Sequence, residues 1–169
     1  MVEEALQQAK AKQIIVLMPT PEYEGAPFPA LLKEVVFYIG SADGLGNPSP
    51  LNPSPNGAAA FIALGEAVRG AQSGTKTDYT TRDGSAVAVM VASGIASLLI
   101  DYTTQRYARG WGADNFENMR SLLLAMSEPT NDSYRYLFPT NLFRKWTDSQ
   151  KLVREIIYNP ESILLKEFL

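Results

Sequence analysis

The chain contains no histidine and no cysteine. Without cysteine it cannot form a disulfide or a thiolate metal site. Without histidine it lacks the commonest general base near neutral pH and the commonest metal ligand. Ser–His and Cys–His pairs are therefore excluded within these 169 residues, and we expect no metal and no cofactor.

The chain also has no excess of basic side chains over acidic ones. Lys and Arg number 15 against 18 Asp and Glu, which gives a formal net charge of -3 and a pI near 5.0. Binding to nucleic-acid phosphates needs clustered Lys and Arg. We therefore expect no nucleic-acid partner.

The sequence lacks a hydrophobic run of the length that spans a membrane. Its longest apolar segment, residues 86–100, is shorter than the roughly 20 residues that a bilayer requires. The amino terminus reads MVEEALQQAKAKQ and has no apolar core of a secretory signal. We expect no membrane partner, and the missing signal and cysteines favour an intracellular location.

The remaining pattern predicts one α/β domain. The length is typical of a single compact domain, and short apolar runs rich in β-branched residues indicate buried strands. We expect a helix at 2–12, strands at 14–18, 35–40 and 58–65, and helices at 85–107 and 115–127. This order favours a parallel sheet, with the first strand buried on both faces.

The polar and C-terminal regions carry weaker patterns. Residues 69–84 are polar and predict a mobile or ligand-facing loop. The segment YRYLFP predicts a short extended piece. Thr147 with Gln150 predicts a capping box, and ESILLKEFL predicts a last helix. We expect residues 1–140 to form the main domain and 141–169 a helical extension packed on it.

The stretch GSAVAVMVASGIASLL at 84–99 resembles the nucleophile motif of the subtilisin-like serine proteases, or subtilases. That family opens a long buried helix with Gly-Thr/Ser-Ser-x-Ala, and its fungal members read Gly-Ser-Ser-Val-Ala. Gly84 and Ser85 fit this pattern, as do the small residues further along the helix. Ala86, however, stands where the family has its nucleophilic serine.

The flanking segments resemble the same family in the same order. ALQQAKAKQIIVLM and PTPEYEG are similar to its helix, buried strand and asparagine-containing loop, and FPALLKEVVFYIGSADGLG and ALGEAV to the segments that follow. The resemblance covers roughly residues 1–140. It implies an α/β fold, the C-terminal part of a subtilisin-like parallel-sheet sandwich with a central buried helix.

The resemblance also implies a site. Ala86 takes the nucleophile position, and Tyr23, or with a one-residue shift Glu22, takes that of the oxyanion-hole asparagine. Gly84, Ser85, Glu22 and Gly25 would border a bound peptide or protein. Since the family's catalytic residues run in the order Asp, His, Ser, the Asp and His would lie in an N-terminal companion segment or chain.

Catalysis is expected to be absent from the chain as it stands. A serine at a helix N-terminus faces unpaired backbone N–H groups that stabilise developing negative charge. Alanine keeps this geometry but supplies no nucleophile. Ser85 cannot take its place because it points about 100° away around the helix.

Two classes of function remain open. The chain is either an inactive fragment or variant of a serine endopeptidase, or a natural pseudoprotease or interaction domain that binds peptides or a partner without cleaving them. An unrelated α/β protein with a small-residue helix is a third alternative. A sheet with only its later strands would expose an apolar edge and face, so we expect the chain to need an N-terminal companion segment, to self-associate or to rearrange.

Overall fold

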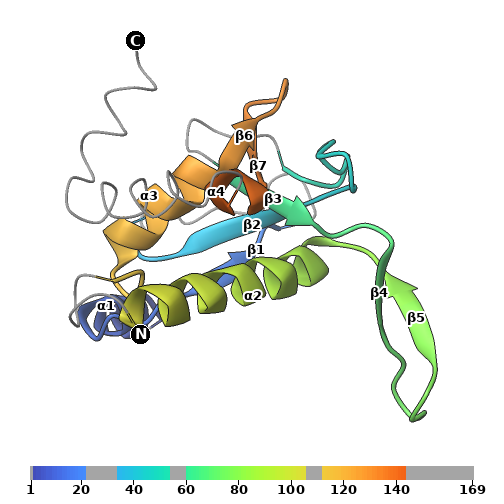
Figure 1. Cartoon of the computed structure of the whole chain (residues 1–169), viewed down its shortest axis with the longest axis horizontal. Coiled ribbons are helices and arrows are strands. Elements are labelled where there is room, and N and C mark those ends of the chain that lie inside the picture. The colour runs from blue at the N-terminus through green and yellow to red at the C-terminus, as the bar shows by residue number, and fades with distance from the viewer. Residues whose placement is uncertain (1, 22–33, 54–59, 106–111, 144–169) are drawn as a thin grey trace.

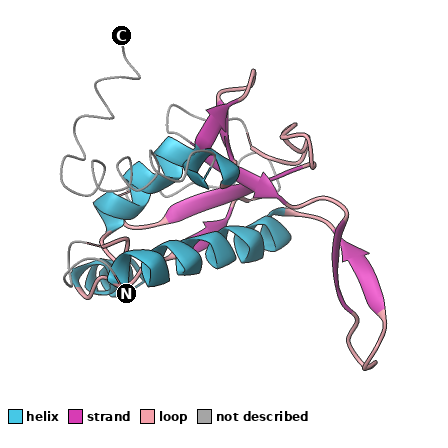
Figure 2. Cartoon of the chain, viewed as in Figure 1, coloured by secondary structure: helices cyan, strands magenta, loops and turns pink. Residues whose placement is uncertain are grey.

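The computed structural model of the chain describes residues 2–21, 34–53, 60–105 and 112–143 (Figure 1). One helix is followed by five strands and then by two helices, and a pair of short strands follows the third helix (Figure 2). The elements are α1 (Val2–Ala11), β1 (Leu17–Pro19), β2 (Phe37–Ala42), β3 (Ala60–Leu64), β4 (Val68–Ala71), β5 (Tyr79–Arg82), α2 (Ser85–Thr104), α3 (Phe116–Met126), β6 (Ser127–Pro129), β7 (Tyr134–Leu137) and α4 (Thr140–Phe143).

The main sheet has five strands in the order β1-β2-β3-β7-β6. Strands β1, β2, β3 and β7 run parallel to one another, and β6 pairs antiparallel with β7. The three predicted strands are present, with β2 and β3 close to their predicted bounds. The α/β class and the parallel core of the sheet are therefore confirmed.

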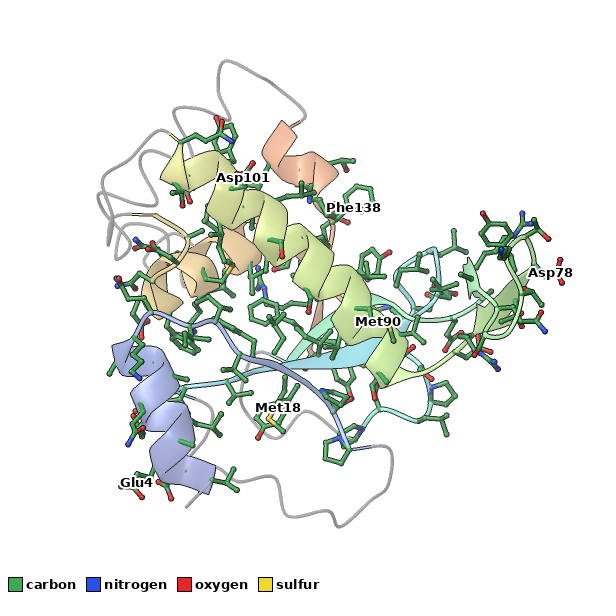
Figure 3. The ribbon with its side chains drawn as sticks, turned by 90° about the horizontal axis from the view of Figure 1, so that it is seen from below. Glu4, Met18, Asp78, Met90, Asp101 and Phe138 are labelled. Carbon is green, nitrogen blue, oxygen red and sulfur yellow. The ribbon has the colours of Figure 1, made fainter. Side chains whose placement is uncertain are left out.

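The core lies between the sheet and two helices. Phe37 and Ile39 of β2 belong to the same buried cluster as Ala88 and Ala92 of α2 and Leu122 of α3. In the view of Figure 3, α2 runs across the strands, and the labelled Met90 and Asp101 lie on it. Leu6 of α1 packs on a smaller cluster. The main core thus joins the sheet to α2 and α3, and α1 packs on the residues that lead into β2.

Phe116 joins α3 to the sheet. Its ring stacks on Phe37 with a centroid separation of 4.3 Å, and Lys10 Nζ lies 4.7 Å from its centroid.

The prediction for the first strand is wrong in position and burial. β1 is Leu17–Pro19, three residues beyond the predicted start, and Ile14 and Met18 are exposed by 53% and 36%. The reason is its place in the sheet, because among the described strands β1 lies at the edge and pairs only with β2. An apolar run looks the same in the sequence whether or not a second neighbour covers it.

The prediction of a loop at 69–84 is also wrong. β4 and β5 form an antiparallel hairpin that pairs Val68 with Arg82 and Ala71 with Tyr79. Figure 1 shows this hairpin projecting away from the main sheet. The guanidinium of Arg69 lies 4.7 Å from the ring centroid of Tyr79. Cross-strand contacts of this kind stabilise a polar hairpin that has no hydrophobic run.

The end of the described region continues the core. Leu142 of α4 is fully buried in the main cluster. The capping box at 147–150 and the last helix lie outside the described residues. The division at residue 140 therefore stays a prediction.

Within the described ranges, α2 has the length and composition of a membrane-spanning helix. Its most apolar window has a mean hydropathy of 1.7, and 28% of that window is buried. Core helices of soluble proteins pass the same test, so a single such helix is weak support for a membrane span. Its inner face packs on β1, β2 and β3.

Candidate functional site

The N-terminus of α2 is the centre of the predicted site, and a glycine with positive φ precedes it. Gly84 precedes the helix with φ 115° and ψ 169°, a conformation that favours glycine because it has no Cβ. Its N–H donates to the carbonyl oxygen of Gly65 at 2.8 Å. Its own carbonyl accepts from the N–H groups of Val87 and Ala88 at 3.0 and 3.1 Å. These bonds fix where the first turn begins.

Gly65, just after β3, lets the helix approach the sheet closely. A Cβ at this position would lie 2.5 Å from Ser41 Oγ, 2.9 Å from Ala88 Cβ and 2.9 Å from the carbonyl oxygen of Gly84. The N–H of Gly65 donates to the carbonyl oxygen of Ala42 at 2.9 Å. The first turn of α2 therefore lies at the carboxyl ends of β2 and β3, where ligands bind in parallel α/β sheets.

The Ser85 side chain has a structural role. Its side chain is 3% exposed, and its Oγ donates a hydrogen bond to the carbonyl oxygen of Thr20 at 3.1 Å. This bond joins the start of α2 to the segment that follows β1. A buried hydroxyl in this position is not presented to a peptide in solvent.

Ala86 has the opposite environment. It is exposed in the first turn of α2, close to the N-terminal end of the helix. A side chain here projects beside the positive end of the helix dipole. The position is suited to a reacting hydroxyl, but the methyl group that occupies it cannot attack a carbonyl carbon.

Two buried hydroxyls near this turn were not predicted. Thr20 and Ser41 are 3% and 2% exposed, and within the described part of the chain Thr20 Oγ1 and Ser41 Oγ have no hydrogen-bond partner. Both follow an apolar run at the carboxyl end of a strand, and this placement was the available signal. Leaving such groups unpaired costs about 1–3 kcal/mol each.

Shifted titratable groups belong to other parts of the molecule. Hydrogen bonds from the side chain and backbone of Asn47 lower the pKa of Asp43, in the loop after β2. Burial raises the pKa of Tyr134 and Tyr136 on β7. Over the described ranges, no group of three or more acidic, His or Cys residues could hold a metal ion.

The structure brings Gly84, Ser85 and Ala86 together with Thr20 and the glycine after β3. The other predicted site residues, Glu22, Tyr23 and Gly25, lie outside the described residues. The oxyanion-hole position thus stays a prediction.

The hydrogen bond of Ser85 leads to a first prediction. Ser85→Ala should lower the free energy of unfolding by about 1 kcal/mol, because it leaves the Thr20 carbonyl without this donor. Urea denaturation followed by circular dichroism measures the change. Ser97→Ala, the same substitution at an exposed position of the same helix, is the control and should be neutral. Equal stabilities of the two variants would contradict the structural role of Ser85.

No protein-family model matches the chain, and no curated protein matches it. Solved structures do. A serine-to-alanine mutant of the protease domain of PatA matches with a TM-score of 0.67 at 20% identity, covering 86% of this chain and 53% of that one. The PatG macrocyclase in complex with peptide matches with a TM-score of 0.64 at 23% identity, covering 76% of this chain and 39% of that one. The prenylagaramide maturation protease PagA matches with a TM-score of 0.64 at 18% identity, covering 82% of this chain and 53% of that one.

These matches establish the fold. The chain has the subtilisin-like fold that its motif implied. It spans between 39% and 53% of the length of the matched structures. The likeness to fungal members and the role of Ala86 stay predictions.

Proposed function

We propose that this chain is the C-terminal part of a subtilisin-like serine endopeptidase domain in which Ala86 holds the nucleophile position. The supporting observation is the first turn of α2, where Ala86 is exposed and Ser85 is buried against Thr20. The chain therefore keeps the geometry that would present a nucleophile but lacks the hydroxyl. It is catalytically inactive as given.

The missing histidine supports the same conclusion. A serine nucleophile needs a base to take its proton, and the chain has no histidine to do so. In this proposal a companion segment supplies the Asp and His, and this chain supplies the helix N-terminus. The residues of a catalytic triad act as a unit, so the loss of one removes most of the activity.

The second candidate is a natural pseudoprotease that binds a peptide or partner chain without cleaving it. It is favoured by the retained glycines at 65 and 84, which hold α2 in place although no nucleophile uses the position. A matched structure, the PatG macrocyclase, is solved in complex with peptide. In this candidate the peptide's carbonyl oxygen accepts from the N–H of Ala86 in the first turn of α2.

Restoring the hydroxyl tests these candidates. Alone, the Ala86→Ser variant should give no labelling by a serine-directed fluorophosphonate and no hydrolysis of fluorescein-labelled casein, because no base is present. Mixed with the polypeptide encoded immediately upstream of this chain, the variant should be labelled if the endopeptidase proposal holds. A complex that binds casein peptides without labelling would favour the pseudoprotease.

Two further variants control this experiment. Ser85→Ala in the wild-type background should give no labelling with the upstream polypeptide, because position 86 still carries a methyl group. Ser85→Ala combined with Ala86→Ser should retain the labelling. Labelling that follows Ser85 instead would refute the assignment of Ala86.

A further inference from the structure

The β4–β5 hairpin is a two-stranded sheet that has no further neighbour among the described strands. It projects away from the main sheet in Figure 1, and Figure 3 shows the labelled Asp78 at its far end, away from α2. A hairpin of two strands is only marginally stable in water. β5 reads Tyr-Thr-Thr-Arg, with no proline or glycine to interrupt pairing. Its outer edge is therefore open to a further strand.

The hydrogen bonds of the hairpin determine which backbone groups this edge presents. Gln72 N–H donates to the carbonyl oxygen of Asp78 at 2.9 Å, and the register of the two strands continues from this pair. Hydrogen-bonded pairs alternate with non-hydrogen-bonded pairs along an antiparallel ladder. Asp78 and Thr80 therefore direct their backbone groups toward β4. The N–H and C=O groups of Tyr79 and Thr81 point outward, away from β4.

The side chains of β5 complement a second copy of the same strand. When two copies pair antiparallel about a two-fold axis at Thr80, Asp78 lies opposite Arg82 of the second copy, and Tyr79 lies opposite its Thr81. The Tyr79–Thr81 pairs are then the hydrogen-bonded ones, which matches the outward direction of their backbone groups. Opposite charges and aromatic–β-branched pairs stabilise neighbouring strands when they face each other.

The two charged side chains are available for this contact. Asp78 and Arg82 are both exposed, and neither forms an ion pair within the described part of the chain. They lie on the same face of β5 because residues two apart share a face. In the paired strands they form non-hydrogen-bonded pairs, in which opposing side chains lie closer together.

Other registers and the other edge of the hairpin fit less well. An axis at Tyr79 keeps the backbone hydrogen bonds but places Lys76 opposite Arg82 of the second copy, and like charges in this position are destabilising. An axis one residue beyond Thr80 pairs no opposite charges. Two β4 strands that pair about Gly70 leave Arg69 without an acidic partner. Charge complementarity therefore selects β5 and the axis at Thr80.

We infer that the outer edge of β5 is an interface for a second copy of this chain, and that two hairpins join into one four-stranded antiparallel sheet. The same edge serves both copies, so the contact closes at a dimer. A single pair of short strands buries little surface, and the dimer is therefore weak and concentration-dependent. The interface uses no residue of the first turn of α2 and no companion segment, so it is independent of the proposed function.

Charge reversal tests the interface and its register. The wild-type chain should form a concentration-dependent dimer in sedimentation velocity. Asp78→Arg places like charges opposite each other in the dimer, as does Arg82→Asp, so each variant alone should raise the dissociation constant at least tenfold. An equimolar mixture of the two variants restores both opposite-charge pairs and should recover association. Asp132→Arg and Lys12→Asp, the matched charge changes at exposed positions elsewhere, should leave the wild-type dimer unchanged.

Hydrogen exchange identifies the surface that associates. The N–H groups of Tyr79 and Thr81 do not bond to β4, so they should exchange more slowly at high than at low protein concentration. Unchanged exchange of these two amides in a dimer would show that another surface associates and would overturn the inference. A wild-type monomer at millimolar concentration, a mixture of the reversed variants that stays monomeric, or equal weakening by the control variants would also overturn it.

Discussion

A Gly65→Ala variant should lose about 3 kcal/mol of its free energy of unfolding, at the upper end of what overpacking costs. The added methyl would lie 2.5 Å from Ser41 Oγ and 2.9 Å from both Ala88 Cβ and the carbonyl oxygen of Gly84. Two of these atoms belong to the start of α2, so the helix must shift or the sheet must bend. Urea denaturation monitored by circular dichroism measures the loss.

The hairpin provides the control for this variant. Gly70 lies in β4, and among the described residues nothing lies within 4 Å of a Cβ built there. Gly70→Ala should therefore change stability by less than about 0.5 kcal/mol. Adding Ser41→Ala to Gly65→Ala should recover part of the loss, because it removes the nearest atom and an unpaired buried hydroxyl. Equal effects at positions 65 and 70 would show that α2 does not approach the sheet closely.

Leu122→Ala should lose about 3 kcal/mol, within the 2–5 kcal/mol range of buried leucine truncations. Leu122 lies on α3, has no exposed surface, and belongs to the cluster that joins α2, α3 and the sheet. The truncation removes buried methyl groups and leaves a cavity that the neighbouring helices fill only in part. The same denaturation experiment measures the change.

Leu45→Ala is the matched control for that truncation. Leu45 is 89% exposed in the loop after β2, so its removal should change stability by less than about 0.5 kcal/mol. A small loss for Leu122→Ala would mean that α3 is not part of a cooperative core. Both variants leave the N-terminus of α2 intact, which separates core stability from the site.

The sequence predicted the elements whose pattern is local. The helix predicted at 85–107 is present as α2, Ser85–Thr104. The strands predicted from the apolar runs at 35–40 and 58–65 are present as β2 and β3. The helix predicted at 115–127 is present as α3, where the Asn115 side chain caps the N–H of Glu117 at 2.9 Å. Periodicity, capping residues and β-branched content are sufficient for such elements.

The sequence failed where a partner strand decides the structure. It missed β6 and the β4–β5 hairpin, since neither has an apolar run and both depend on pairing across a turn. It also took the strand before Pro19 as buried on both faces. Whether a strand lies at the edge of a sheet depends on which other segment pairs with it, and residue composition does not record that.

By itself, the sequence determined that the chain has no histidine or cysteine and that a methyl group stands at position 86 of a subtilase-like motif. The order of its motifs was also sufficient for the fold. Only the tertiary structure decided that Ser85 is buried and that Ala86, Met90 and Leu98 of α2 are exposed. The reason is that helix formation alone does not determine which face of the helix is buried. That depends on tertiary contacts such as the hydrogen bond between Ser85 and Thr20, which are 65 residues apart.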